Sequence, residues 1–133
     1  MKILKVYTPV FMHNNQLEES IAFYEQLLGE RCDLCFLYPE AGMEIATVDS
    51  MLLVAGPESG IAHVKEMKLA LLVDSFNEWK EELLKKGATI LSEPQEVPTG
   101  YNMFVRHPDG SFVEYIEWVS EKVAAVNLIK TSL

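Results

Sequence analysis

Apolar residues in this chain either alternate with polar ones or form short uninterrupted runs, and both patterns predict β-strands. Two other segments place apolar residues three and four positions apart, which is typical of an amphipathic helix. The pattern predicts helices between Asn15 and Gly29 and between Ser75 and Gly87. It predicts strands over residues 3–12, 32–38, 43–48, 51–55, 68–73, 89–92, 101–106 and 111–118.

Both predicted helices carry signals for their first and last residues. Asn15 and Ser75 are predicted N-caps, and each is followed three positions later by a glutamate that would complete a capping box. Gly29 and Gly87 stand just past the predicted ends, where glycine relieves the strain of a left-handed residue.

The predicted elements repeat as βαβββ followed by βαβββ. Residues 23–28 resemble residues 79–84, and residues 43–49 resemble residues 103–109. The chain is therefore predicted to be one α+β domain over residues 1–133. It comprises a first module (about 1–56), a linker (about 56–63), a second module (about 64–118) and a tail (119–133). Val123, Val126 and Ile129 predict a short amphipathic helix in that tail.

The net charge of the chain limits the kinds of molecule that it is expected to bind. The 133 residues carry a formal net charge of −9 and the sequence pI is near 4.7. Such a balance disfavours nucleic acid or an anionic membrane as a partner, and is compatible with a cationic ligand. No apolar stretch approaches the length of a transmembrane span, and no signal peptide is evident, so the predicted location is the cytoplasm.

Glu114 is the most unusual residue of the predicted strands. It shares a strand face with Phe112 and Ile116, because side chains two apart point the same way. If that face is enclosed, the carboxylate is enclosed with it, and it needs an ion pair, hydrogen bonds, a proton or a metal.

Three segments together resemble the vicinal oxygen chelate superfamily, which includes glyoxalase I, bleomycin resistance proteins and extradiol dioxygenases. The segments are LEESIAFYEQLLG (17–29), LALLVDS (69–75) and FVRHPDGSFVE (104–114). The resemblance implies two tandem βαβββ modules whose curled mixed sheets form a barrel-like cleft. It also implies that metal-dependent members hold a divalent ion there through up to four His, Gln or Glu ligands.

Carried over residue by residue, the resemblance leaves one metal ligand of four, which is Glu114. The other three positions fall on Tyr7, on Leu53 or Val54, and on Lys68. One carboxylate is too few for a divalent ion, because catalytic zinc sites need about three protein ligands. We therefore expect no metal and no other cofactor, as in metal-poor glyoxalase-like or bleomycin-resistance-like members. Lys68 would pair with Glu114 or hold an oxyanion of a ligand; alternatively it extends into solvent at a strand end.

The expected ligand-binding residues combine these positions with aromatic side chains, part of which could instead be ordinary core. They are Tyr7, Phe36, Lys68, Tyr101, Phe104, Phe112 and Glu114.

Three functions follow from these residues. The first is metal-independent binding that sequesters a small molecule, cationic or aromatic, such as an antibiotic or metabolite. The second is a glyoxalase-like lyase or isomerase, or a dioxygenase-related enzyme, with Glu114 as metal ligand or general base. The third is a domain whose cavity is filled with side chains. A homodimer is expected, because small open sheets leave edges that a partner chain can cover.

Overall fold

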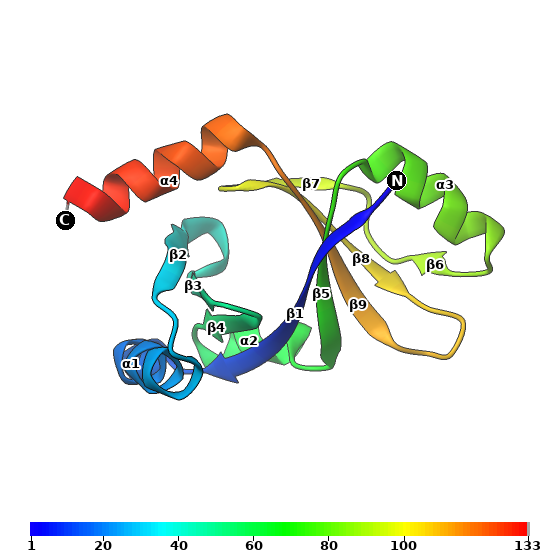
Figure 1. The fold of residues 1–133 in the computed structure, drawn as a ribbon. Coiled ribbons are helices and arrows are strands. Elements are labelled where there is room, and N and C mark those ends of the chain that lie inside the picture. Colours follow the sequence, from blue (N-terminus) through cyan, green and yellow to red (C-terminus); the bar gives the residue numbers. More distant parts are fainter. Residues whose placement is uncertain (133) are drawn as a thin grey trace.

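The protein forms one curled mixed sheet flanked by helices (Figure 1). The structure, a computed structural model, describes the backbone of residues 1–132 and the side chains of residues 1–126. Its strands are β1 (Ile3–Met12), β2 (Cys32–Tyr38), β3 (Met43–Val48), β4 (Met51–Ala55), β5 (Met67–Val73), β6 (Thr89–Ile90), β7 (Gln95–Val97), β8 (Gly100–Arg106) and β9 (Phe112–Trp118). Its α-helices are α1 (Leu17–Leu28), α2 (Glu58–Val64), α3 (Phe76–Lys85) and α4 (Ser120–Ser132).

The two βαβββ modules pair with each other within the chain. The strand order is β2-β3-β4-β1-β5-β9-β8-β6, with β7 also paired to β8, and the sheet does not close. Strands β1 and β5 are antiparallel neighbours, with Tyr7 opposite Ala70. Strand β1 runs parallel to β4, and β5 runs parallel to β9. The predicted α+β class, tandem modules and curled mixed sheet are confirmed.

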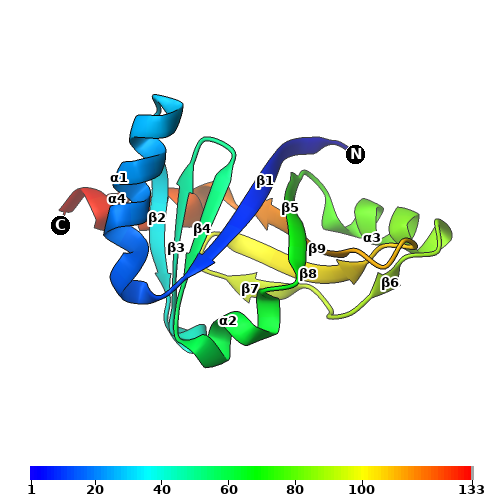
Figure 2. The same cartoon turned by 90° about the horizontal axis from the view of Figure 1, so that it is seen from below.

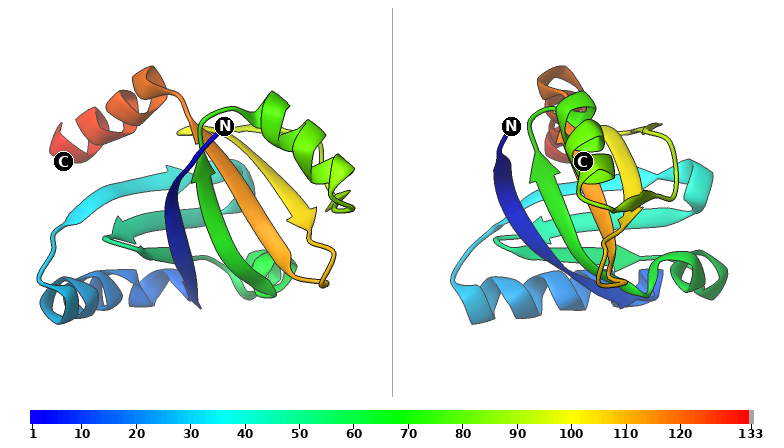
Figure 3. Two further views of the ribbon diagram at one scale, coloured as in Figure 1. Left: turned by 45° about the vertical axis from the view of Figure 1, so that its right-hand side comes forward. Right: turned by 90° about the vertical axis from the view of Figure 1, so that its right-hand side faces the viewer.

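Helices α1 and α3 lie on the outer side of the sheet, one over each module (Figures 2 and 3). Leu17 of α1 packs on a core that includes Ala46, Val48 and Leu53. Phe76 and Leu83 of α3 belong to the corresponding core of the second module. A third apolar cluster has Tyr7 near its centre and contains residues of both modules. The helices thus cover the convex face, and the concave face is left for a cavity.

The segment predicted as a linker connects the two modules, and most of it is helix α2. Gly56 and Pro57 resemble a flexible connection in sequence, yet Pro57 has the extended backbone of an N-cap, where a fixed φ is well tolerated. Ile61 and Val64 are three positions apart, so they lie on one side of the helix. Ile61 packs against the central cluster, and Val64 lines the cavity. This packing makes a short, glycine-containing segment helical.

Two further elements differ from the prediction. The structure adds strand β7 and shortens the predicted strand 89–92 to Thr89–Ile90. Asn15 is not an N-cap, because it lies in a 3₁₀ turn (Asn14–Gln16) whose capping box is made by His13 and Gln16. Ser75 is the N-cap of α3 but makes no side-chain capping bond. Gly29 ends α1 in the left-handed region at φ 68°, as predicted.

Helix α4 confirms the predicted C-terminal helix. It leaves the end of β9 and runs towards β2, which it contacts (Figure 1). Lys122 near its start is 2.5 Å from Glu96, and Val123 and Val126 are half-buried. The side chain of Ile129 lies outside the described residues. Among the helices described, none is both long and apolar enough to cross a membrane.

Gly100 at the start of β8 lies against the backbone of β9, and we predict that Gly100→Ala is strongly destabilising. A Cβ there would lie 2.1 Å from the backbone oxygen of Glu117 on β9, which cannot move without breaking the ladder. We expect a loss above about 2 kcal/mol in the free energy of unfolding, measured by urea denaturation.

Gly29→Ala is the matched control for this prediction. Gly29 has positive φ, but nothing lies within 4 Å of the added Cβ. This substitution should cost only about 1–2 kcal/mol, the price of a left-handed alanine. Equal losses in the two variants would contradict the proposed clash.

Candidate functional site

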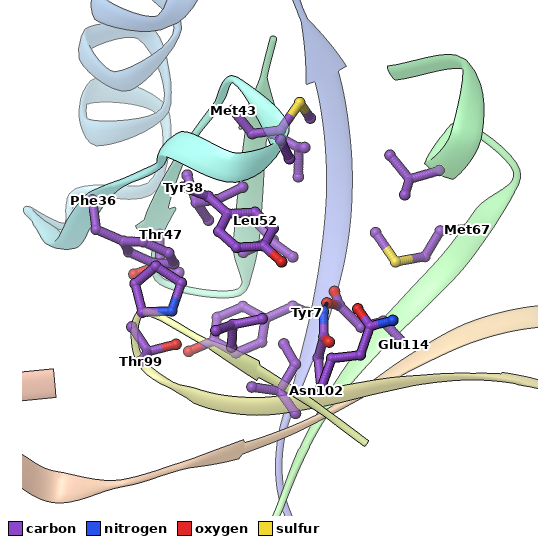
Figure 4. Close-up of a pocket in the computed structure, with 18 of the residues that line it drawn as sticks. Tyr7, Phe36, Tyr38, Met43, Thr47, Leu52, Met67, Thr99, Asn102 and Glu114 are labelled. Atoms are coloured by element: carbon purple, nitrogen blue, oxygen red, sulfur yellow. Dashed lines mark hydrogen bonds between the residues drawn. The ribbon is translucent and has the colours of Figure 1, made fainter. Parts of the chain in front are cut away.

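A cavity of about 330 Å³ lies on the concave face of the sheet, between the two modules. Side chains of β1 to β4 form one wall, and side chains of β5, β8 and β9 form the other (Figure 4). Helix α2 and the segment 95–99 complete the wall. The lining is mainly apolar and includes Met43, Leu52, Val54, Met67, Ile116 and Trp118. The cavity is of the size and character that small-molecule sites usually have.

Glu114 is a half-buried carboxylate in this apolar wall. Strand β9 places it between β5 and β8, and the two-residue alternation puts Ile116 and Trp118 in the same wall. Its Oε2 accepts a hydrogen bond of 3.0 Å from Nδ2 of Asn102. Its Oε1 has no hydrogen-bond partner among the described residues. Burial raises the pKa of Glu114 to about 7, while the hydrogen bond from Asn102 acts in the opposite direction.

Asn102 is the residue that holds Glu114, and the sequence analysis missed it. It lies on β8, is 9% exposed, and lines the cavity. Its Oδ1 is buried and has no partner among the described residues. The sequence did contain a signal, because Asn102 lies two residues before Phe104 and therefore shares its strand face. The diagonal pairing with Glu114 depends on the register between β8 and β9.

Lys68 does not reach Glu114, so the predicted ion pair is wrong. The register between β5 and β9 shifts between Met67 and Leu69. This irregularity turns Met67 into the cavity and leaves Lys68 exposed. The alternative that Lys68 extends into solvent is the one observed. An expectation of strict alternation along β5 fails because a bulge changes which side chain points inward.

The predicted aromatic residues divide into two groups. Tyr7, Phe36 and Phe104 line the cavity, whereas Tyr101 and Phe112 do not. Tyr101 is next to Asn102 on β8 and therefore points to the other face, where Lys122 lies 5.0 Å from its ring. Phe112 packs beside Phe104, with ring centroids 5.3 Å apart, outside the cavity wall.

Tyr38 and His63 line the cavity although the sequence analysis did not select them. Burial raises the pKa of the Tyr38 hydroxyl most, and the negative charges of Glu40 and then Glu114 raise it further. His63 belongs to α2, and the interpretation of its segment as a linker hid it. Both reach the cavity through tertiary packing, for which the local sequence carries little signal.

The positions that the resemblance assigns to metal ligands do not fit a divalent ion. Tyr7 is buried, and burial raises its pKa to about 12, so it is a neutral phenol near pH 7. Leu53 points away from the cavity into the core beneath α1, and the neighbouring Val54 supplies only methyl groups. Lys68 is exposed. Within the described part of the chain, no three His, Cys, Asp or Glu side chains are grouped so that they could hold a metal.

The chain is similar over most of its length to proteins of known structure. An uncharacterised protein from Methanosarcina mazei is 38% identical, with 90% of this chain and 95% of that chain covered and a TM-score of 0.82. Methylmalonyl-CoA epimerase from Mycobacterium tuberculosis is 17% identical, with 92% and 93% covered and a TM-score of 0.70. A hypothetical protein from Bacillus halodurans C-125 is 18% identical, with 89% and 94% covered and a TM-score of 0.68.

The last two similarities show a shared fold. Among curated proteins, none matches this chain. Residues 8–115 match the family described as Glyoxalase/Bleomycin resistance protein/Dioxygenase superfamily. This match covers most of both βαβββ modules, and the chain therefore belongs to the Glyoxalase/Bleomycin resistance protein/Dioxygenase superfamily.

Proposed function

We propose that this protein binds a small molecule in the cavity between its modules and needs no metal ion to do so. The observation that carries the proposal is a mainly apolar cavity of about 330 Å³ with one carboxylate–amide pair in its wall. Few convergent polar groups in an apolar pocket are typical of ligand sites. The third function considered from the sequence, a cavity filled with side chains, is at odds with this open volume.

The pair formed by Asn102 and Glu114 favours a binding role because it lowers the stability of the protein without ligand. A buried carbonyl oxygen without a partner, such as Oδ1 of Asn102, costs about 1–3 kcal/mol. Burial of the Glu114 carboxylate has a further cost, which its raised pKa reports. Two apolar side chains would make this part of the wall more stable. Polar groups kept at such a cost are expected where they contact a ligand.

An enzyme is the second candidate, and the pKa of Glu114 favours it. A carboxylate that titrates near pH 7 is suited to remove a proton from a substrate. Some structures with the same fold are methylmalonyl-CoA epimerases, one of them in complex with methylmalonyl-CoA. That molecule is strongly anionic, whereas no lysine or arginine lines the described cavity wall. Incubation with methylmalonyl-CoA in D₂O would reveal exchange of its α-proton by mass spectrometry, and we expect none.

We also propose that the protein is a homodimer. Large apolar side chains stay exposed on two elements of the convex side, among them Val6 of β1 and Phe23 and Leu27 of α1. Phe23 and Leu27 are four residues apart and therefore adjacent on the helix surface. Strand β2 also ends the sheet and pairs with β3 alone. A second copy could bury these groups, as expected from the sequence.

Three further predictions test these proposals, and the first is that binding needs no metal. Titration with 1-naphthol, followed by tryptophan fluorescence, should give the same Kd within a factor of two in EDTA and after addition of nickel, zinc or manganese ions. Trp118 in the cavity wall is the expected reporter.

Leu52→Trp should abolish this binding, because Leu52 lines the cavity and the larger ring would fill part of it. Leu37→Trp is the control, because Leu37 is exposed on β2. Binding that appears only with metal, or that survives Leu52→Trp unchanged, would overturn the proposal.

The second prediction concerns the stability of the empty protein against pH. Between its ordinary pKa of 4.5 and about 7, Glu114 keeps its proton in the folded protein and loses it in the unfolded chain. The folded protein then binds more protons, so its free energy of unfolding falls as pH rises through this window. Relative to Glu114→Gln, wild type should lose about 3 kcal/mol between pH 4.5 and 8, at about 1.4 kcal/mol per pH unit. Urea melts at several pH values measure this difference, and a constant difference would show that Glu114 is not enclosed.

The third prediction concerns assembly. Light scattering should give twice the chain mass of 15.1 kDa at micromolar concentration. The substitutions Phe23→Glu and Leu27→Glu each place a carboxylate on α1. If α1 lies in the interface, they should shift the protein towards the monomer, because a carboxylate is costly to bury there. A monomeric wild type would contradict the proposal.

A further inference from the structure

Glu114 is the one acidic side chain in the described cavity wall. The titratable side chains of the wall are Tyr7, Tyr38, His63 and Glu114, and no lysine or arginine lines it among the described residues. Lys5 lies 5.1 Å from the centre of the Tyr7 ring but does not line the cavity. An anionic group placed here would meet the Glu114 carboxylate without a compensating cation. The wall therefore discriminates against anionic ligands.

Glu114 presents one carboxylate oxygen for a ligand. The amide of Asn102 donates to Oε2 and so holds the carboxyl group in place, while Oε1 keeps no partner among the described residues. Ala70 of β5 is the neighbour of Glu114 in the sheet register, and its side chain cannot donate a hydrogen bond to this oxygen. On the other side, β8 contributes Asn102 and Phe104. An acceptor without a donor is left in an apolar space.

Aromatic rings surround the same space. Phe36 and Tyr38 come from β2, Tyr7 from β1, Phe104 from β8 and Trp118 from β9. Aromatic faces attract cations, and the attraction grows when the cation is withdrawn from water. They also stack on flat apolar groups. A carboxylate within an aromatic cavity thus combines an ion-pair acceptor with a surface that tolerates both the charge and the body of an organic cation.

We propose that the ligand is an organic cation whose N–H group, an ammonium, amidinium or guanidinium, donates to Oε1 of Glu114 while its apolar or aromatic body fills the rest of the cavity. This inference rests on the proposed function and names the chemical class of ligand for the same site. The charge-assisted hydrogen bond formed in this way is about twice as strong as a neutral one. A cavity of roughly 150 Å³ holds benzene, so about 330 Å³ accommodates a two-ring body with a polar end group.

A matched pair of probes tests the charge directly. 2-Naphthamidine is cationic, whereas 2-naphthamide has nearly the same shape and is neutral. We expect wild type to bind the amidine about tenfold or more tightly than the amide, measured by calorimetry at pH 8 and low salt. In Glu114→Gln, which keeps the shape of the side chain and Asn102 as its neighbour, the preference should fall to about one.

Glu117→Gln is the control for a general effect of net charge. Glu117 is on the same strand, and its Oε1 accepts from the backbone N–H of Phe76, outside the cavity. This variant removes the same formal charge and should keep the preference for the amidine. A preference that persists in Glu114→Gln, or that disappears in Glu117→Gln, would overturn the assignment to Glu114.

A pH profile on the wild type gives a readout that does not depend on a substituted protein. Because the cation binds the ionised carboxylate, the affinity for the amidine should rise by up to tenfold per unit between pH 6 and 7 and level off above pH 7. The affinity for the amide should not follow this profile. His63 also lines the cavity, so the profile is repeated in His63→Gln, where it should persist.

The outcomes separate this inference from the proposed function. If the amide binds as tightly as the amidine, the cation inference is wrong and the cavity is still a binding site. If 1-naphthol binds and neither naphthamide nor naphthamidine does, the cation inference is again wrong. If none of the three molecules binds at millimolar concentration, both proposals fail.

Discussion

The antiparallel pairing of β1 with β5 is the constraint on which the rest of this structure depends. Neither module encloses a cavity by itself, because each contributes a curved half-sheet with one helix on its convex side. The register that sets Tyr7 opposite Ala70 joins the halves, and the parallel pairing of β5 with β9 then brings Glu114 into the same wall. A shift of this register by one residue would exchange the inward and outward faces of β1. The cavity and its polar pair therefore exist only as a property of both modules together.

Within that cavity, stability and recognition oppose each other. The convex side of the sheet is packed with apolar side chains under α1 and α3. The concave side keeps a half-buried carboxylate and an amide oxygen that has no partner among the described residues. Hydrogen bonding between Asn102 and Glu114 reduces the cost of burial but does not remove it, as the pKa of about 7 for Glu114 shows. A ligand that donates to the carboxylate would satisfy an acceptor that the protein itself leaves open.

Three of the four positions at which the resemblance implies metal ligands carry other residues in this chain. Where the resemblance places His, Gln or Glu ligands, this chain has a buried phenol, an aliphatic pair and an exposed lysine. The fourth position keeps its carboxylate, but an amide donor now holds it. These replacements support the proposed metal-independent binding, in which the open oxygen of Glu114 would accept from a donor of the ligand.

Local sequence determined most of the fold of this protein, because periodicity and repetition are local properties. Alternation in the strands, the repeated order of elements and the glycine after α1 predicted the modules, and the resemblance to the superfamily implied the inward position of Glu114. Only the tertiary structure decided which side chains join Glu114. A bulge in β5 turns the side chain of Met67, and not that of Lys68, into the cavity. The register between β8 and β9 brings Asn102 to the carboxylate. Packing of Ile61 and Val64 makes the apparent linker helical, as α2. Bulges, registers between distant strands and contacts across modules depend on residues far apart in the chain, and no single segment encodes them.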